Sequence, residues 1–288
     1  MVRMGAALLV AACVAERDPA GAARLAAPRF AQSQNLDGTP AADLIVDTTR
    51  LAHSWLVYDQ DLVAQDLCAQ FEGGVTPGVH RVLRFTVTTP NVGTADLVIG
   101  NPLDHVRAQD GLFEFASCHL HFHMRHFASY ELVSVGTGQP KLIRAAKKGF
   151  CMIDDTPWQF AGGVGSPNFR TCGTFTIPGN QGISVGWADT YDKHIGGQYF
   201  VLDGGDGQDP VPPGEYIIRI TVNPPFECTD FDRAHNRPVD PRGMCHNFLE
   251  SNYDNNVGEV RITIPDRTGK TGFGLGSVNQ LDAELVAP

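Results

Sequence analysis

The sequence predicts an all-β domain, a β-sandwich core with long loops and little helix. The composition is typical of a turn-rich chain with a buried core, because its 288 residues include 31 glycines and 19 prolines and only 19% are charged. Short segments of alternating apolar and polar residues recur between clusters of turn residues, which favours strands. The sequence contains no convincing amphipathic helix, no internal repeat and no nucleotide-binding glycine loop.

The strands are predicted where apolar and polar residues alternate, or where β-branched and aromatic residues gather. Order is expected to begin at 42–46. The predicted strands are then 83–89 with 94–100 as its neighbour, a histidine-containing strand that ends near 135, 149–153, 214–223 and 255–265. The stretch 214–223 (GEYIIRITVN) alternates most regularly. Turn residues dominate 154–180, which predicts a long loop, and loops of that length are usually functional.

The N-terminus predicts export. Arg3 precedes a short apolar run that is too short to span a membrane, so residues 1–12 are interpreted as a signal peptide. Small residues precede Cys13, as in bacterial lipoprotein signals, so we expect Cys13 to be lipidated and to tether the protein to a membrane. The alternative is an ordinary cleaved signal with an incidental cysteine. Residues 13–40 are expected to form a flexible tether.

One domain is predicted over 41–266, followed by a Gly-rich tail at 267–288. The formal net charge of −10 argues against nucleic acid as a partner, since phosphate binding needs clustered lysine and arginine. Both readings of the signal place the domain outside the cytoplasm, where disulfides are permitted. Setting Cys13 aside leaves six of the seven cysteines, and spacing alone does not choose among their pairings.

Alternating histidines mark the candidate site. On a strand, residues two apart share a face, so His119, His121 and His123 are expected to present three imidazoles side by side. The opposite face would carry Leu120, Phe122 and Met124. Three neutral imidazoles with open positions suit copper, zinc or iron. The alternative is a solvated strand face that binds no metal.

Two further motifs follow in order. The histidine strand reads C-H-x-H-x-H, 147–151 reads K-K-G-F-C, and 189–191 reads D-T-Y. Together they resemble the lysyl oxidase family, whose pattern is C-H-x-H-x-H, then K-x-x-F-C, then D-x-Y. The resemblance covers roughly 42–265 and implies a lysyl oxidase-like catalytic domain.

The resemblance implies a copper-dependent amine oxidase. His119, His121 and His123 would hold copper, and Lys147 and Tyr191 would cross-link to form lysine tyrosylquinone. Lys148 is one place off the motif. Substrates would be primary amines, with peptidyl lysine as a candidate, converted with O2 to aldehydes, hydrogen peroxide and ammonia.

The catalytic base is the point of departure from the family. Animal members have a histidine before the tyrosine of the histidine strand, where this chain has Ser129. The candidates to replace it are His126, Asp189 and His194. Asp189 is favoured because it keeps its family position, two residues before Tyr191.

The resemblance also implies disulfides and a second metal. The pairs would be Cys68–Cys118 and Cys151–Cys172, which leaves Cys228–Cys245. A calcium site would take its oxygen ligands from Asp43, the Leu44 carbonyl, Glu250, Asn252, Asn255 and Asn256. Asn252 replaces an aspartate and should weaken this site, and the alternative is an Asx-rich turn that enters a strand.

Two other functions remain open from the sequence. One is a non-catalytic, extracellular copper- and calcium-binding β-sandwich lipoprotein that serves in binding or adhesion. The other is a lysyl oxidase-like domain in which the quinone never forms. Fold analogy does not separate these from the enzyme, because function resides in the site.

Overall fold

The computed structural model describes residues 41–62, 67–136, 141–158, 166–266 and 273–275. The predicted signal peptide, the tether with Cys13 and most of the C-terminal tail lie outside the described residues. The all-β prediction is confirmed, because strands make up most of the regular structure and the helices are short. Within the described ranges, no helix has the length and apolar character needed to cross a membrane.

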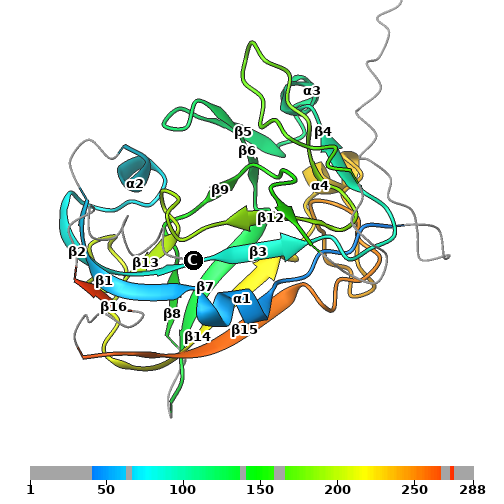
Figure 1. Cartoon of the computed structure of the whole chain (residues 1–288). Helices are drawn as coiled ribbons and strands as arrows, with labels where there is room; N and C mark the ends of the chain where they lie inside the picture. The colour runs from blue at the N-terminus through cyan, green and yellow to red at the C-terminus, as the bar shows by residue number, and fades with distance from the viewer. Residues whose placement is uncertain (1–40, 63–66, 137–140, 159–165, 267–272, 276–288) are drawn as a thin grey trace, which may run out of the picture.

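The first large sheet carries the early strands. Its order is β13 (Tyr199–Val201), β2 (Gly78–Phe85), β1 (Trp55–Leu62) and β16 (Phe273–Leu275). The pairing is antiparallel except between β1 and β16, which run parallel. The four strands of this sheet are labelled β1, β2, β13 and β16 in Figure 1.

The second large sheet is antiparallel throughout. Its order is β15 (Val257–Ile264), β14 (Gly214–Val222), β7 (Ala128–Ser134) and β8 (Leu142–Arg144). In β14 the residues Tyr216, Ile218 and Ile220 are buried and their neighbours are not, which matches the alternation in the sequence. The strands predicted at 214–223 and 255–265 are therefore confirmed.

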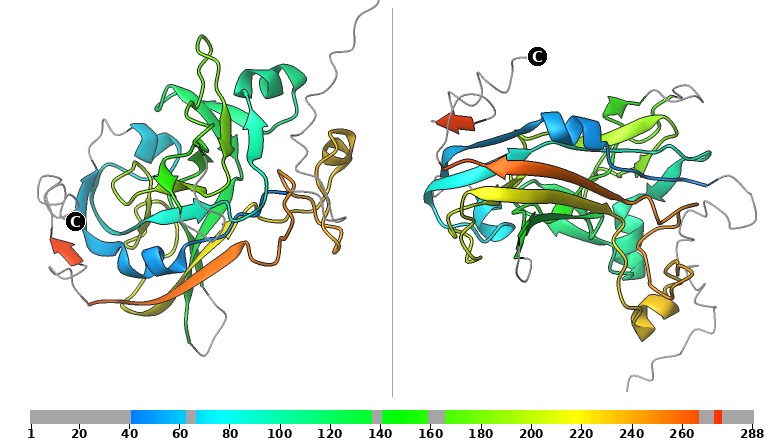
Figure 2. Two further views of the ribbon diagram at one scale, coloured as in Figure 1. Left: turned by 45° about the vertical axis from the view of Figure 1, so that its right-hand side comes forward. Right: turned by 90° about the horizontal axis from the view of Figure 1, so that it is seen from below.

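The two large sheets lie next to each other in the fold (Figures 1 and 2). They pack against each other through aromatic side chains. Phe85 of β2 meets Tyr130 of β7 edge to face, with ring centroids 5.4 Å apart, and stacks on Phe200 of β13 at 4.7 Å. Fully burying such a side chain stabilises the fold by about 1.5–3 kcal/mol. This contact closes the predicted sandwich.

Smaller sheets hold the motifs. They are β10 (Thr156–Pro157), β12 (Trp187–Tyr191) and β3 (Val87–Pro90); β11 (Gln181–Ile183) and β4 (Leu97–Gly100); and β5 (Phe113–Ala116), β6 (His121–Arg125) and β9 (Gly149–Phe150). The predicted loop 154–180 contains only β10 among its described residues.

The predicted pairing of 83–89 with 94–100 is wrong. The first segment breaks at Thr86, whose backbone N–H donates to the carbonyl of Ser54, so β2 and β3 belong to different sheets. β3 pairs with β12, and β4 pairs with β11. The side-chain amide of Asn91 donates to the carbonyls of Ala95 and Ile183, each at 2.9 Å, and this directs the chain after β3 away from it.

Each of the four helices in the described ranges is a short connector. They are α1 (Thr48–His53), α2 (Leu67–Phe71), α3 (Pro102–Ala108) and α4 (Asp230–Ala234). α4 begins with a capping box, in which the Thr229 hydroxyl accepts from the Asp232 N–H and the Asp232 carboxylate accepts from the Thr229 N–H.

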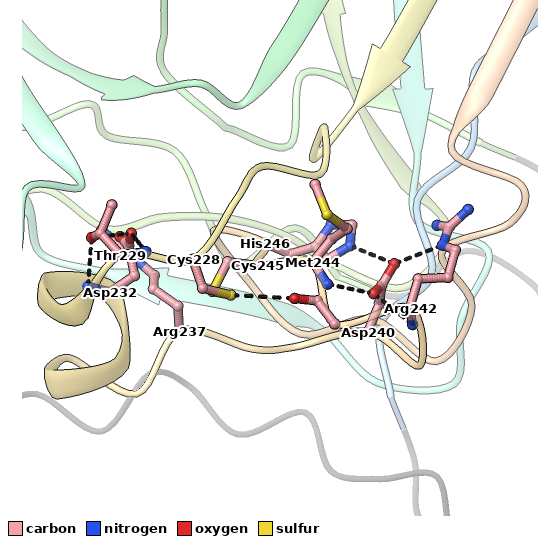
Figure 3. Close-up of a disulfide and its surroundings, with 10 residues drawn as sticks. Cys228, Thr229, Asp232, Arg237, Asp240, Arg242, Met244, Cys245 and His246 are labelled. Atoms are coloured by element: carbon pink, nitrogen blue, oxygen red, sulfur yellow. Dashed lines mark hydrogen bonds and ion pairs between the residues drawn. A yellow bond between two sulfur atoms is a disulfide. The ribbon is translucent and has the colours of Figure 1, made fainter.

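Three disulfides join the pairs expected from the family resemblance. They are Cys68–Cys118, Cys151–Cys172 and Cys228–Cys245. The third closes the segment 228–245, which contains α4 and Asp240 and ends next to His246 (Figure 3). The first two fasten segments that carry the candidate site.

Candidate metal and cofactor site

The histidine motif does not lie on one continuous strand, which corrects the sequence prediction. β5 ends at Ala116, and its carbonyl accepts the N–H groups of His119 and Leu120, which closes a turn before β6 begins. Leu120 adopts a φ of +58° and is 68% exposed, so it does not share a buried face with Phe122. His121 and His123 do share one face of β6.

The three imidazoles nevertheless converge, because the turn carries His119 back over the strand. Ring centroids are 5.5 Å apart for His119 and His121, 5.1 Å for His119 and His123, and 4.9 Å for His121 and His123. The Nε2 atoms of His121 and His123 lie 3.1 Å apart. These residues are called the histidine cluster below.

The electrostatics of the cluster favour neutral imidazoles. Burial, followed by the charge of Lys147, lowers the pKa of His123 to about 2. The same two causes, in the same order, lower the pKa of His121. Since metals bind the neutral ring, the residues present fit a copper or zinc ion.

Lys147 and Tyr191 lie together beside this cluster. The Lys147 side chain is buried, with its Nζ 5.6 Å from the centre of the Tyr191 ring and 5.9 Å from that of Phe150. Lys148 points outward, and its Nζ donates to the carbonyl of Ala145. The structure therefore brings to the tyrosine the lysine that the motif predicted.

The Tyr191 hydroxyl is held by one backbone unit. It accepts from the Cys151 N–H at 2.6 Å and donates to the Cys151 carbonyl at 2.9 Å. The Cys151–Cys172 disulfide fixes this unit in turn. Burial lowers the pKa of Lys147, while the charges of Glu72 and Asp189 oppose that shift. A lowered pKa increases the fraction of neutral amine, which is the nucleophilic form.

The three candidate bases lie in different surroundings. Asp189 is buried on β12, and burial together with the charge of Asp155 raises its pKa well above the usual value. His126 is exposed in the turn after β6, at a φ of +54°. His194 lies at the surface, paired with Asp192.

A cavity of about 450 Å³ lies over one side of Lys147. Ser129, the residue found in place of the family histidine, lines it together with Tyr130 and His126. Of the candidate bases, His126 is the one on the wall of this cavity.

Glu72 joins the cluster, although no motif predicted it. Its Oε1 lies 3.6 Å from His119 Nε2 and 3.6 Å from His123 Nδ1. Glu72 follows α2, four residues after Cys68. The expected Cys68–Cys118 disulfide is the sequence signal that points to Glu72, because it brings the segment after Cys68 next to His119, which follows Cys118.

Arg84 is a second residue that the motifs missed. It is buried on β2, and its Nε donates to the Tyr58 hydroxyl at 2.9 Å and to Gln60 Oε1 at 2.9 Å. Its Nη1 donates to the carbonyls of Lys193 and Ile195, in the loop directly after Tyr191. No pattern in the sequence distinguishes this arginine from a surface one.

The loop that Arg84 holds runs along the site. A Cβ built on Gly197 would lie 3.4 Å from the Cα of Lys147, and one built on Gly196 would lie 3.9 Å from the His119 ring. Gly197 has a φ of +76°, so a larger residue there would be strained. Arg84 therefore fixes a segment that contacts both Lys147 and the histidine cluster.

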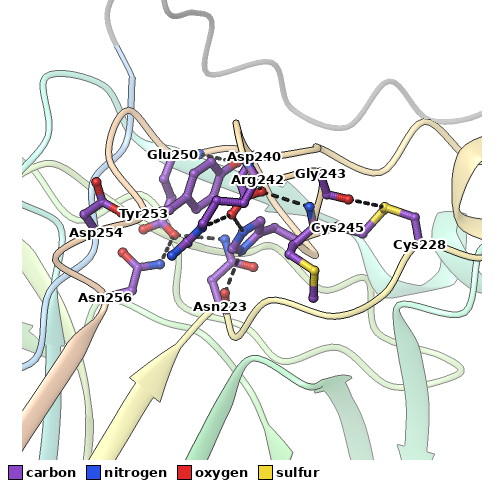
Figure 4. Close-up of polar contacts among 12 residues, drawn as sticks. Asn223, Cys228, Asp240, Arg242, Gly243, Cys245, Glu250, Tyr253, Asp254 and Asn256 are labelled. Carbon is purple, nitrogen blue, oxygen red and sulfur yellow. Dashed lines mark hydrogen bonds and ion pairs between the residues drawn. A yellow bond between two sulfur atoms is a disulfide. The ribbon is translucent and has the colours of Figure 1, made fainter.

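The predicted calcium ligands gather where β15 begins. Glu250 is buried, with its Oε1 accepting from the Leu44 N–H at 2.7 Å. Its Oε2 accepts from the side-chain amides of Asn223 and Asn256, at 2.9 and 2.7 Å (Figure 4). Burial raises the pKa of Glu250 to about 8.

Two amide oxygens of this group fit a cation. Asn255 Nδ2 donates to Asp43 Oδ1 at 2.9 Å, while Asn255 Oδ1 and Asn256 Oδ1 are buried with no hydrogen-bond partner among the described residues. Buried acceptors of this kind are ligands that calcium prefers. Asn252 is exposed, and its Oδ1 accepts from the Asp254 N–H within the turn.

Comparison with known proteins gives one consistent family. The family model described as lysyl oxidase matches residues 63–240. Human lysyl oxidase homolog 1 is 30% identical over 217 residues, which is 72% of this chain and 33% of the human protein. Pig protein-lysine 6-oxidase is 30% identical over 185 residues, which is 62% of this chain and 65% of the pig protein. Chicken lysyl oxidase homolog 2 is 28% identical over 68% of this chain and 24% of its own length. The chain thus spans less than two thirds of these relatives.

Proposed function

Because the chain belongs to the lysyl oxidase family, we propose that it is a copper-dependent amine oxidase that builds its own quinone cofactor. The reaction converts a primary amine, O2 and water to an aldehyde, ammonia and hydrogen peroxide. The observation that carries this proposal is the buried Lys147 amine 5.6 Å from the Tyr191 ring, beside the histidine cluster.

His119, His121 and His123 would hold the copper ion. Copper, when bound, would allow O2 to oxidise Tyr191 so that it cross-links with Lys147 as lysine tyrosylquinone, and the quinone would supply the electrophilic carbonyl and the electron sink for amine oxidation. The lowered pKa values of His121 and His123 support this assignment, because both rings are then neutral and free to bind.

The chain's own residues prepare the two cofactor side chains. The Cys151 backbone holds the Tyr191 hydroxyl, so the ring keeps one orientation. Burial favours the neutral amine of Lys147. The distance between amine and ring is longer than a bond, so cross-linking requires a modest movement of the segment before β9.

Asp189 is proposed as the proton acceptor. It lies two residues before Tyr191 on β12 and therefore on the same face of that strand. Its raised pKa makes its carboxylate a stronger base than an exposed aspartate. Ser129 cannot take this role, since a hydroxyl is a poor base near neutral pH.

The substrates are proposed to be primary amines, with peptidyl lysine as the leading candidate. The cavity that Lys147 helps to line has a volume of about 450 Å³, which is room enough for an extended lysyl side chain. The charge of the wall does not itself select a cationic substrate, because Glu131 is accompanied there by Arg144 and Lys148.

A calcium ion is proposed for the group around Glu250. Asp43, the Leu44 carbonyl, Asn252, Asn255 and Asn256 would complete its ligands. The two unpartnered amide oxygens support this site. Calcium there would tie the start of the domain at Asp43 to the start of β15.

We also propose that the protein works outside the cytoplasm, lipid-anchored through Cys13 or secreted. Three disulfides support an oxidising compartment.

The test is mass spectrometry of copper-treated protein, with Lys147→Arg and Lys148→Arg as a matched pair. The proposal expects one cross-linked peptide containing residues 147 and 191, quinone absorbance and amine-dependent peroxide release. Lys147→Arg should lose all three and Lys148→Arg should keep them. His121→Ala should lose copper and peroxide release together. Unmodified peptides with no amine-dependent O2 uptake would favour a non-catalytic copper- and calcium-binding module.

A further inference from the structure

We propose that Glu72 is a ligand of the metal centre, contributing a carboxylate oxygen beside His119 and His123. This inference rests on the proposed copper site and adds a residue to it. No motif in the chain points to Glu72, and only the folded structure brings it to the cluster.

The distances carry the assignment. Glu72 Oε1 lies 3.6 Å from His119 Nε2 and 3.6 Å from His123 Nδ1, and the ligand atoms of the three residues all lie within 4.8 Å of one another. Bonds of about 2.0–2.2 Å from one ion to nitrogen and oxygen place neighbouring ligands about 3.0–3.6 Å apart. An ion thus fits among these atoms with small side-chain adjustments.

A covalent bridge holds Glu72 in this place. The Glu72 N–H donates to the carbonyl of Cys68 at 3.0 Å, and Cys68 is bonded to Cys118. Cys118 is in turn the neighbour of His119. The Glu72 side chain is 17% exposed, so it does not belong to the solvated surface.

Charge favours the same conclusion. A divalent cation between these side chains would form an ion pair with the Glu72 carboxylate. A carboxylate ligand would also offset part of the positive charge that copper adds next to Lys147.

The two nitrogens of His123 face different partners. Nδ1 faces Glu72, and Nε2 faces His121. The donor atoms of Glu72, His119 and His123 gather on the Nδ1 side of this ring, while His121 lies on its Nε2 side.

The experiment measures copper(II) binding to the metal-free full chain by competition with a chelator, together with the copper electron paramagnetic resonance spectrum. Glu114→Gln is the matched control, since Glu114 lies on β5 near Glu72 but is 53% exposed and pairs with Arg125. Glu72→Gln should weaken copper binding at least tenfold and change the spectrum, and Glu114→Gln should do neither.

Glu72→Asp keeps the charge but shortens the side chain, so a ligand role predicts weaker binding there as well. This variant also serves if Glu72→Gln does not fold. Copper affinity and spectra equal to those of Glu114→Gln would overturn the inference. His121→Ala separates the two proposals. If that variant loses copper while both Glu72 variants retain it, only the role of Glu72 fails. If it also retains copper, the proposed copper site fails.

Discussion

Gly149 lies directly against the ring of His123. A Cβ at this glycine would stand 2.0 Å from Nδ1 and 2.7 Å from Cγ of the imidazole, closer than any non-bonded contact allows. The third position of the K-K-G-F-C motif is therefore set by the histidine cluster, since only glycine lets β9 pair beside His123.

Gly149→Ala should displace the His123 ring. Overpacking at such a site costs about 1–3 kcal/mol of unfolding free energy, and the moved ring should lower copper affinity as well. Chelator competition and urea unfolding measure the two effects. Gly136→Ala is the control, because a Cβ there meets nothing within 4 Å. Equal copper binding by the two variants would show that the contact does not position His123.

Arg84→Met should loosen the loop after Tyr191. It removes the hydrogen bonds that the charged guanidinium donates to the Tyr58 hydroxyl, Gln60 and two loop carbonyls, and hydrogen bonds to a charged group each contribute about 1.5–3 kcal/mol. We expect a loss of about 3 kcal/mol in urea unfolding and slower formation of the cross-link.

Arg261→Met provides the comparison for Arg84. Arg261 pairs with Glu215 on an exposed face of β15, and exposed ion pairs contribute about 0–1 kcal/mol. If Arg84→Met loses no more unfolding free energy than Arg261→Met, Arg84 does not hold the loop beside the site.

Asp110 should make stability depend on acid pH. Burial opposes its ionisation, but hydrogen bonds from His105 at 2.6 Å and from the Leu112 N–H at 3.0 Å outweigh burial and lower its pKa below 3.8. A lowered folded-state pKa stabilises the protein above pH 3.8, and this contribution is lost as the pH falls through the folded-state value.

The pH dependence is measured as the urea midpoint between pH 3 and 7 in the wild type and in Asp110→Asn. The midpoint of the wild type should fall more steeply at the acid end, and the two proteins should approach each other there. Parallel curves would contradict the role of Asp110. Asp104→Asn is a suitable control, because Asp104 is 54% exposed and pairs only with the exposed Arg107 among the described side chains.

Calcium should stabilise the wild type but not Glu250→Gln. Binding to the folded state alone adds about 2.7 kcal/mol at a hundred times the dissociation constant, which raises the melting temperature by several degrees. Glu259→Gln on the exposed face of β15 should respond like the wild type. An equal calcium response in Glu250→Gln would exclude the proposed site.

The sequence predicted the strands whose two faces differ. β14 was found because Ile218 and Ile220 face the core while Arg219 faces outward, so the chemical pattern and the burial pattern coincide. The partners of β3 and β4 were not found, because strand pairing depends on where the chain turns. Here that depends on hydrogen bonds of Asn91 that the pattern of apolar residues does not encode.

The sequence likewise predicts some residues of the site correctly and misses others. Motif spacing predicts Lys147 rather than Lys148 as the cofactor lysine, and the structure places Lys147 inside. Period-two alternation predicts that His119 lies on the strand, although the chain reverses at Leu120. Glu72 was missed because its nearness to His123 is made by a bridge between residues 50 apart.

The two backbone hydrogen bonds that hold the Tyr191 hydroxyl bear on the order in which the cysteines and the tyrosine are oxidised. Its two hydrogen bonds come from Cys151, whose position depends on the bond to Cys172. A newly made chain without that bond would present a loosely held phenol and an unpaired thiol to any copper it met. Under the proposed function, the two cysteines are therefore expected to oxidise before the tyrosine, which would confine cofactor formation to chains that have already folded.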